Sequence, residues 1–422
     1  MYKYFKKVFI LKEDVLFMQE VINKITPSKK EREQVDSLIK NFFKKLKLKD
    51  AIPEIGGSMA KDTWLSGDYD IDVFVKFPYK MYKNKDISKE LQNRLKNIKY
   101  EVLHGSRDYL QIKQGKFLFE LIPVISINHS SKHLNITDVS PLHAKFVKEF
   151  NKNPEQIRLA KAFLKANNLY GAESYIKGFS GYITELLVIN YGSFQNLIKA
   201  ASRWKQTTII DMSNHYKSKE EILKNLNKDK ITNLILIDPV QPERNAGTAL
   251  SEEKYLEFIE TCKSYLRNPS NEFFELKEFN IKKLKEKKNK NKLVMFTIKA
   301  LDGKPDVVGS KILKVFNYIK NKISEEGYKV LEGKWQWKEE ALLYYIVKDE
   351  KLSDKILHYG PFKKDIENVK NFKKKWKKVY FDNERAYTKI KRKYKTINAF
   401  NKQFLKDNFI KERVKKIELD VY

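Results

Sequence analysis

Apolar and polar residues alternate along residues 69–77, which read YDIDVFVKF, and this alternation predicts a β-strand. Side chains on a strand point to opposite faces in turn, so Asp70 and Asp72 share one face and the apolar residues between them share the other. Two further runs, Tyr109–Lys113 and Lys116–Val124, predict strands joined by a tight turn. Residues 51–127 are therefore expected to be rich in strands.

The spacing of apolar residues changes to a helical period from Pro154 onward. Residues 155–168 place four apolar side chains on one stripe, namely Ile157, Ala160, Phe163 and Leu164. Residues 1–50 predict two helices broken at Thr26-Pro27-Ser28, with Ser28 as the N-cap of the second. Later segments predict helices at 181–191, 193–202 and 251–267 and a buried strand at 234–237.

The last third of the chain is more basic and changes pattern again. We expect a solvated hairpin tip at 282–292, a strand at 293–300, a helix at 310–326 and strand character at the end of 330–348. Lys370–Lys395 is very basic and interleaved with aromatic residues, a combination that suits RNA because phosphate contacts and base stacking both contribute. The alternative interpretation is one amphipathic helix with a lysine-rich wet face.

The carboxylate pair Asp70 and Asp72 follows the glycine turn Gly56-Gly57-Ser58 after about a dozen residues. Two carboxylates on one face repel each other unless a cation lies between them, and Mg²⁺ is a hard cation that prefers oxygen ligands. The N–H groups of the turn and the Ser58 hydroxyl can donate to phosphate oxygens. Each motif alone is usually a turn or a solvated strand edge; together they predict nucleotidyl transfer.

Glu120 is the candidate for a third acidic ligand, which a two-metal site requires. It is the only acid in the apolar run KFLFELIPV at 116–124, and an acid in such a strand is rarely buried without a partner. The alternative interpretation is a surface charge on an edge strand.

Composition supports a nucleic-acid partner. The 422 residues are too many for one core and indicate two to four domains. The formal net charge of +31 points to a polyanion, although codon bias in an AT-rich genome would also favour lysine. The single cysteine, Cys262, excludes a disulfide within the chain and fits a reducing cytoplasm. We find no zinc-ligand spacing, signal peptide or membrane-spanning apolar run.

These motifs become specific enough to indicate a family. The resemblance rests on the segments GGSMAKDTWLSGDYDIDVF (56–74), DVSPLH (138–143), RLAKAFLKANNLYGAESYIKGFSGYITELL (158–187), YGSF (191–194), RW (203–204), DPVQPERN (238–245) and PSNEFF (269–274). Two less specific segments are PDVVGS (305–310) and HYGPF (358–362). On these residues the chain resembles the archaeal-type, class I CCA-adding tRNA nucleotidyltransferases. The similarity covers most of the first 275 residues and becomes thinner toward the end.

The resemblance implies an α+β multidomain protein in head, neck, body and tail order. It gives a polymerase-β-like nucleotidyltransferase head at 1–150, a helical neck for nucleotide recognition at 151–268, and an α/β RNA-binding body and tail at 269–422. It also implies addition of C, C and A to the tRNA 3′ end without a template. The 3′-hydroxyl would attack the α-phosphate of CTP or ATP and release pyrophosphate, with two Mg²⁺ ions as cofactors.

The resemblance also assigns residue roles. Asp70 and Asp72 match the metal-binding pair, Glu120 stands where the family usually has Asp, and Lys61 stands where Arg is common. Nucleotide-binding roles fall on Gly57, Ser58, Lys61, His143, Lys161, Tyr170 and Arg244, the last as a reader of the incoming base. Read without the family, Lys161 is a solvated helix lysine, Tyr170 a core aromatic, His143 a surface-loop residue and Arg244 a salt bridge at a helix start.

The expected partners are tRNA, contacted at its acceptor stem and elbow, and the substrates CTP and ATP. No membrane contact is expected, and the oligomeric state stays open, with a homodimer as one option. Two alternatives remain: another RNA 3′-terminal nucleotidyltransferase that adds poly(A) or A only, and a catalytically silent RNA-binding protein. The three intact carboxylates argue against the silent protein.

Overall fold

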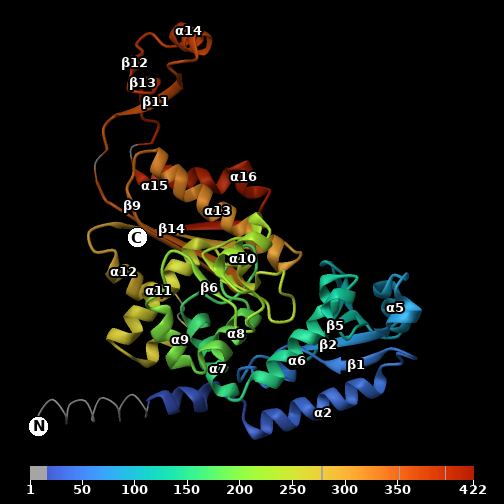
Figure 1. Cartoon of the computed structure of the whole chain (residues 1–422). Coiled ribbons are helices and arrows are strands. Elements are labelled where there is room, and N and C mark those ends of the chain that lie inside the picture. The colour runs from blue at the N-terminus through green and yellow to red at the C-terminus, as the bar shows by residue number, and fades with distance from the viewer. Residues whose placement is uncertain (1–16, 277–278, 351, 395) are drawn as a thin grey trace, which may run out of the picture. The chain divides into compact units, whose positions relative to one another are not determined.

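The computed structural model describes residues 17–276, 279–350, 352–394 and 396–422. The chain divides into two compact units, Met1–Lys277 and Glu278–Tyr422, and we describe each by itself. Both units combine helices with sheets (Figure 1), which confirms the α+β multidomain class. No helix in these ranges is long and apolar enough to span a bilayer.

The first unit contains a five-stranded mixed sheet with strand order β1-β2-β5-β4-β3. Its strands are β1 (Ile52–Ile55), β2 (Asp70–Pro78), β3 (Glu101–Leu103), β4 (Tyr109–Gln114) and β5 (Phe117–Ser126). β2 and β5 pair in parallel and the other neighbours pair antiparallel. The three predicted strands are thus confirmed as β2, β4 and β5. Because β5 lies between β2 and β4, the edge-strand interpretation of Glu120 is wrong.

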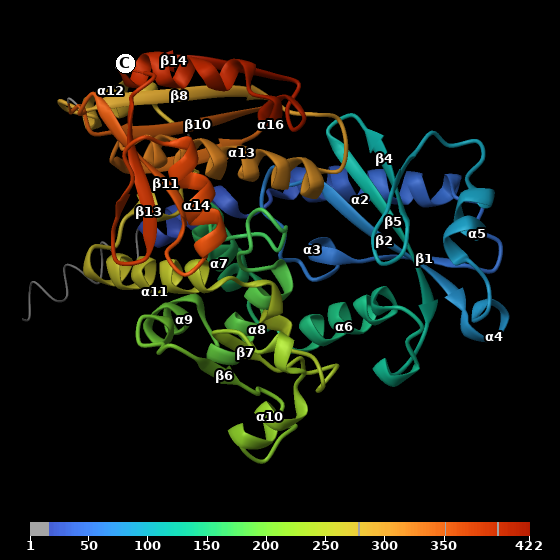
Figure 2. The ribbon, with the colours of Figure 1, turned by 90° about the horizontal axis from the view of Figure 1, so that it is seen from above.

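The helix α2 (Lys29–Lys45) covers one face of this sheet (Figure 2). As predicted, Ser28 caps it: the Ser28 hydroxyl accepts from the Glu31 amide at 3.2 Å, and the Glu31 carboxylate accepts from the Ser28 amide at 2.9 Å. The Phe42 ring stacks on Phe119 with 4.0 Å between centroids. Since Phe119 and Glu120 point to opposite faces, α2 lies on the face away from Glu120. The short helices α4 (Tyr79–Tyr82) and α5 (Ile87–Arg94) follow β2.

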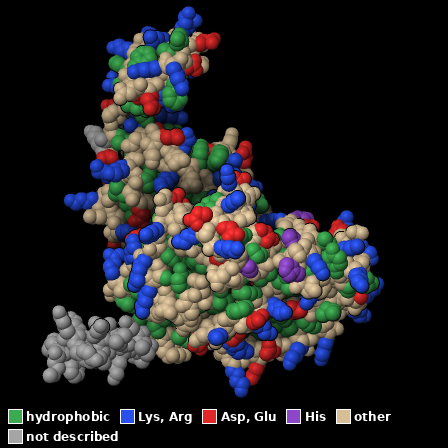
Figure 3. Space-filling model, viewed as in Figure 1, with side chains coloured by type: hydrophobic (Ala, Val, Ile, Leu, Met, Phe, Trp, Pro, Cys, Tyr) green, Lys and Arg blue, Asp and Glu red, His purple; other side chains and the backbone are tan. Residues whose placement is uncertain are grey.

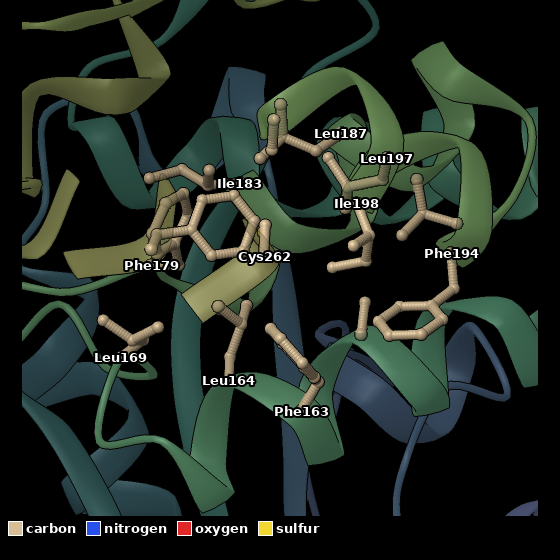
Figure 4. Packing of buried hydrophobic residues seen from close by; sticks show 14 of the residues in the cluster. Phe163, Leu164, Leu169, Phe179, Ile183, Leu187, Phe194, Leu197, Ile198 and Cys262 are labelled. Carbon is tan, nitrogen blue, oxygen red and sulfur yellow. The ribbon is translucent and has the colours of Figure 1, made fainter. Parts of the chain in front are cut away.

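The rest of the first unit is mostly helical and encloses an apolar core (Figure 4). Its main helices are α6 (Ser140–Phe150), α7 (Pro154–Ala166), α8 (Gly181–Tyr191), α9 (Phe194–Ala201) and α11 (Glu252–Arg267). The predicted stripe of α7 is buried, with Phe163 packed edge-on against Phe194 and Tyr265 at 5.5 Å each. Gly192 ends α8 in the left-handed region at φ +79°, so α8 and α9 are separate helices as predicted.

A small parallel pair of strands completes this region. It consists of β6 (Thr208–Ile210) and β7 (Leu234–Leu236), accompanied by α10 (Lys219–Asn225). Residues 234–237 are fully buried, as their apolar sequence predicts. Asp238 follows immediately, which places a carboxyl group at the end of a buried strand.

The second unit contains a four-stranded antiparallel sheet with strand order β14-β8-β10-β9. Its strands are β8 (Lys292–Lys299), β9 (Val330–Trp337), β10 (Glu340–Val347) and β14 (Lys416–Val421), and its helices are α12 (Ile281–Lys287), α13 (Pro305–Glu325), α15 (Ile397–Asn401) and α16 (Asn408–Lys411). The hairpin tip expected at 282–292 is wrong, because α12 buries Leu284 against Met295 and Tyr344.

A second, smaller sheet in this unit holds most of the basic segment Lys370–Lys395. Its elements are β11 (Lys355–Phe362), α14 (Ile366–Lys375), β12 (Tyr380–Phe381) and β13 (Arg385–Lys391), and its strand order is β11-β13-β12. The alternative of one amphipathic helix is therefore wrong, although Lys395 itself lies outside the described residues. Lys and Arg side chains lie among apolar and acidic ones over this part of the surface (Figure 3).

Candidate active site

The register of β2 on β5 brings the predicted acids to one face of the first sheet. Asp72 is the partner of Glu120 and Asp70 the partner of Leu118. Paired residues on adjacent strands share a face, and alternation places Asp70 on that face too. We call it the carboxylate face. Asp72 and Glu120 are partly buried and Asp70 is exposed, so the face opens to solvent at its Asp70 end.

The carboxylates on this face are difficult to ionise. Burial raises the pKa of Asp72 to about 6, helped by the negative charges of Glu120 and Asp70 and opposed by Lys61 and Lys161. Burial and the Asp68 charge raise the pKa of Asp70. Burial also raises the pKa of Glu120, although its hydrogen bond from Gln111 works against this. A cation beside these groups would relieve their mutual repulsion.

The donor chemistry of the carboxylate face fits a hard divalent cation, because it offers carboxylate oxygens on one side of a sheet. The Glu120 carboxylate is held by Gln111 Nε2 at 2.6 Å, from the neighbouring strand β4. In the ranges that the structure covers, no three His, Cys, Asp or Glu side chains are gathered around one point as a metal would require. The acids therefore share a face without converging on one point.

The predicted phosphate turn lies directly against Asp72. The Gly56 amide donates to the Asp72 carbonyl at 2.8 Å. Gly57 has φ +54°, and a Cβ there would lie 1.6 Å from Asp72 Oδ2, so any other residue would clash with the carboxylate. Ser58 follows in the short helix α3 (Gly57–Ala60) and is partly exposed. The turn therefore keeps Ser58 close to the carboxylate face.

Lys61 and Lys161 meet at a buried carboxylate that sequence reasoning missed. Lys61 Nζ donates to Glu185 Oε2 at 2.6 Å, and Lys161 Nζ donates to Glu185 Oε1 at 3.0 Å. Thr63 Oγ1 also donates to Glu185 Oε1, at 2.9 Å. Burial acts to raise the pKa of Glu185, but the charges of Lys161 and Lys61 outweigh it and the pKa lies below its usual range. We call these four residues the lysine cluster; the solvated-helix interpretation of Lys161 is wrong because its side chain is 4% exposed.

Tyr170 lies close enough to the lysine cluster for the charge of Glu185 to affect the pKa of its phenol. It is partly buried, and its hydroxyl lies so close to Gly181 that a Cβ there would be 2.9 Å from the oxygen. Burial, with the negative charges of Glu185 and Asp68 added, raises the pKa of Tyr170 above its usual range. The phenol is therefore a neutral hydrogen-bond donor at physiological pH.

His143 and Arg244 meet at a second buried acid, Asp238. Arg244 Nη1 donates to Asp238 Oδ2 at 2.7 Å, and His143 Nε2 lies 3.0 Å from the same oxygen. Tyr182 OH donates to Asp238 Oδ1 at 3.1 Å, and its ring lies 4.4 Å from the His143 imidazole between centroids. We call these four residues the Asp238 cluster. The Arg244 side chain remains 37% exposed.

The Asp238 carboxyl stays ionised in this setting. Burial acts to raise its pKa, but the nearby His143 imidazole, the Val240 amide and the Arg244 charge outweigh it and lower the pKa. The salt bridge anticipated as the alternative for Arg244 therefore exists. The surface-loop interpretation of His143 is wrong, because His143 lies on α6 with a side chain 13% exposed.

Two sequence signals would have found the missed acids. Glu185 is the only acid in the apolar helix α8, which is the same argument that singled out Glu120. Asp238 directly follows the buried run 234–237. A buried acid needs partners in either setting. Gln111 and Tyr182 carry no comparable signal, because both are ordinary in their elements.

Comparison with known proteins agrees with the resemblance seen in the sequence motifs. Two family profiles match: tRNA nucleotidyltransferase, second domain, over residues 155–275, and CCA-adding enzyme, C-terminal domain, over residues 289–415. The CCA-adding enzyme of Sulfurisphaera tokodaii is 31% identical over 394 residues, covering 92% of this chain and 91% of the relative. That of Nanoarchaeum equitans is 34% identical over 345 residues, covering 81% of this chain and 84% of the relative.

Among solved structures, the Cid1 poly(U) polymerase crystal structure matches with a TM-score of 0.47 and 17% identity, over 63% of this chain and 99% of its own. This likeness is too low to support a conclusion. The sequence relatives are stronger, since one aligns with 92% of the chain and the two profiles follow each other along it. The chain therefore belongs to the archaeal-type CCA-adding enzymes, a family of tRNA nucleotidyltransferases.

Proposed function

We propose that this protein adds C, C and A to the 3′ end of tRNA from CTP and ATP and releases pyrophosphate. As a tRNA nucleotidyltransferase it adds nucleotides to the tRNA 3′ end. The observation that carries the finer proposal is the carboxylate face, with Asp72 beside Glu120 and the Gly57 turn against Asp72. A triphosphate on the turn would have its α-phosphate near these acids.

Enzymes of this kind use divalent metal ions, and we assign them here to two Mg²⁺ ions held by Asp70, Asp72 and Glu120. When bound, such ions would activate the attacking hydroxyl and neutralise charge on the triphosphate. Glu120 reaches farther than Asp would by one methylene, and Gln111 Nε2 holds it at 2.6 Å. Glu120 would therefore have to turn from Gln111 to join the pair.

The remaining residues would bind and orient the nucleotide. The turn at Gly57 and the Ser58 hydroxyl would donate to the β- and γ-phosphates, together with Lys61 and the neutral phenol of Tyr170. Lys161 would contribute its buried positive charge through the lysine cluster. Positioning and electrostatic stabilisation account for most catalysis in such reactions.

The Asp238 cluster would serve the base and ribose. Within the described ranges, Arg244 hydrogen-bonds through Nη1 to Asp238, which leaves its other nitrogens for a base edge, where a planar fork of donors can make paired hydrogen bonds. His143 is held beside it by the same carboxylate and by the Tyr182 ring. Such an arrangement selects between bases, whereas lysines near the phosphates do not.

The net charge of +31 supports tRNA as the polyanion. We assign the acceptor stem to the first unit and the tRNA elbow to the small sheet of the second unit, with Tyr359, Phe362, Tyr380 and Phe381 exposed on it among lysines. A homodimer is a further option that sedimentation would test.

The direct experiment uses tRNA that ends at the discriminator base. The protein is incubated with Mg²⁺ and labelled CTP, ATP or both, and the products are sequenced. We expect CC with CTP alone and CCA with both nucleotides. Runs of A, or A alone, would indicate another RNA 3′-terminal nucleotidyltransferase. Binding without incorporation would indicate a silent RNA-binding protein.

A further inference from the structure

Glu185 is fully buried, and its carboxylate accepts hydrogen bonds from two lysines that lie on different elements. It lies on α8, whereas Lys161 lies on α7 and Lys61 lies just after α3. Its two oxygens are divided: Oε2 accepts from Lys61 and Oε1 accepts from Lys161 and Thr63. A buried carboxylate shared in this way fixes where both ammonium groups lie.

The two lysines differ in what they have left to offer. Lys161 Nζ donates to Glu185 Oε1 at 3.0 Å, Thr63 Oγ1 at 2.8 Å and the Thr63 carbonyl at 3.2 Å, which uses its three donors. In the described part of the chain, Lys61 Nζ has Glu185 Oε2 as its one hydrogen-bond partner. Its side chain is 11% exposed. Lys61 therefore retains donors for a ligand, and Lys161 does not.

Lys61 is also better placed than Lys161 to contact a triphosphate on the Gly57 turn. It follows the Gly57 turn, which lies against Asp72. A lysine side chain has four rotatable bonds and loses much freedom when it is fixed in one place. A partner that holds Nζ before the nucleotide arrives removes that loss from the binding step.

We propose that Glu185 is a positioning residue that fixes the Lys61 ammonium beside the carboxylate face, where it contacts the triphosphate. This inference rests on the proposed function and adds to it a residue that never touches substrate. It predicts that Glu185 acts on nucleotide binding mainly through Lys61, because Lys161 keeps its two contacts with Thr63 when Glu185 is replaced. A purely structural Glu185 would instead affect folding and leave the two residues independent.

The test is a double-mutant cycle on the full chain with tRNA in excess. Lys61→Met and Glu185→Gln are each expected to raise KM for CTP and ATP about tenfold, the size of one lost charge-assisted hydrogen bond. The double variant should then lie within about twofold of Lys61→Met, because most of the effect of Glu185 is already lost. KM for tRNA should stay within about twofold of the parent, since tRNA affinity comes from distributed contacts.

The matched control is Asp62→Asn. Asp62 directly follows Lys61, but its carboxylate pairs with Arg32 at 2.6 Å and Arg158 at 3.4 Å and not with Lys61. We expect it to lower thermal stability without changing KM for nucleotides. Where Glu185→Gln does not fold, Glu185→Asp takes its place: it keeps the charge, draws the carboxylate back by one methylene, and should raise KM about threefold in the parent but not beside Lys61→Met.

Additive effects of the Lys61 and Glu185 variants would overturn the inference, as would an unchanged KM for nucleotides in Glu185→Gln or Glu185→Asp. So would an unchanged KM in Lys61→Met. The products made by the parent protein test the proposed function separately, because the cycle compares KM for any nucleotide that the parent adds.

Discussion

At the residue scale, two buried acids each hold two of the residues predicted to bind the nucleotide. Glu185 holds Lys61 and Lys161, and Asp238 holds His143 and Arg244. Breaking a buried ion pair by removing one partner is costly, because it leaves a desolvated charge behind. Each acid therefore restricts its partners to a small set of positions before any substrate binds.

The acids of β2 should control chemistry and not RNA affinity. We predict that Asp72→Ala and Asp70→Asn each lower nucleotide incorporation by about a thousandfold, because the proposed function makes these carboxylates the metal ligands. The Kd for tRNA should remain within a few fold, because phosphate contacts supply affinity. Single-turnover incorporation and filter binding measure the two effects. Substantial residual activity in either variant would move the metal site elsewhere.

Arg244 and Lys161 should differ in what they recognise. We predict that Arg244→Ala impairs selection of CTP and ATP over UTP, because a guanidinium can make paired hydrogen bonds to a base edge. Lys161→Ala should weaken binding of all three nucleotides equally, because the buried charge of Lys161 does not distinguish one base from another. Apparent KM values for CTP, ATP and UTP in both variants decide this. Equal losses for all bases in Arg244→Ala would contradict the assignment.

At the element scale, single helices and strands connect the parts of the site. α8 presents Tyr182 to Asp238 and, one turn later, Glu185 to the two lysines. The parallel register of β2 on β5 places Asp72 beside Glu120. A shift of this register by one residue would turn the acids of one strand to the opposite face. The arrangement therefore depends on how well these elements are fixed.

The start of α2 offers a test of element stability by pH. Burial acts to raise the pKa of Glu31, but hydrogen bonds from Ser28, Tyr69 and Ser66 outweigh it and lower the pKa to about 2 from 4.5. A lowered folded-state pKa stabilises the protein above the unfolded value, and the stabilisation is lost as pH falls toward the folded value. We predict that Glu31→Gln lowers the thermal midpoint by a few degrees at pH 7.

This difference between the parent and Glu31→Gln should narrow steadily from about pH 5 downward, because the parent carboxyl becomes protonated. Thermal unfolding between pH 7 and pH 3 measures it. Glu33→Gln is a suitable control, since Glu33 lies on the same helix turn and makes one exposed contact with Lys29 at 3.9 Å. A difference in thermal midpoint that stays constant between pH 7 and pH 3 would show that the charge of Glu31 has no role in stability.

At the scale of the whole molecule, the second unit is distinguished by its surface charge and exposed aromatic residues. It carries exposed aromatics and many lysines on its small sheet and α14. Basic residues neutralise phosphates and release counterions, and aromatics stack on unpaired bases. The proposed function therefore assigns tRNA affinity to this unit and the reaction to the first.

Four exposed lysines test this division: Lys370, Lys373, Lys374 and Lys377. We predict that replacing all four by alanine weakens tRNA binding and flattens its salt dependence, by a slope of up to about three in a plot of log K against log salt. Turnover at saturating tRNA should change little. Tight binding by the variant at moderate salt would show that these lysines are only solvated, and the charge surplus would act from another surface.

The same variant should distinguish full tRNA from a minihelix that keeps only the acceptor stem. If the small sheet contacts the elbow, the four substitutions weaken binding of full tRNA by about tenfold and leave the minihelix nearly unchanged, because the minihelix lacks the elbow. Competition binding with both RNAs in one buffer makes the comparison. Equal losses for the two RNAs would place these lysines on the acceptor stem.

The sequence by itself determined the strands β2, β4, β5 and β7, most of the main helices of the first unit, and the face that Asp70 and Asp72 share. Period-two alternation fixes which side chains share a face, so the alternation alone was enough to put Asp70 and Asp72 together. An acid in an apolar strand needs a partner, and that local argument selected Glu120. The helical stripe of α7 and the cap at Ser28 depend on neighbours within a few residues and were predictable for the same reason.

Only the tertiary structure decided which distant residues meet. Lys61 and Glu185 are 124 positions apart, and nothing in either segment identifies the other. Asp238 gathers His143, Tyr182 and Arg244 from three segments, so the surface-loop alternative for His143 does not hold: its side chain is 13% exposed. The basic segment around α14 divides into a helix and two strands because the pairing of β13 with both β11 and β12 overrides its local helical pattern. Long-range contacts of this kind carry no periodic signal, since chain geometry alone does not fix them.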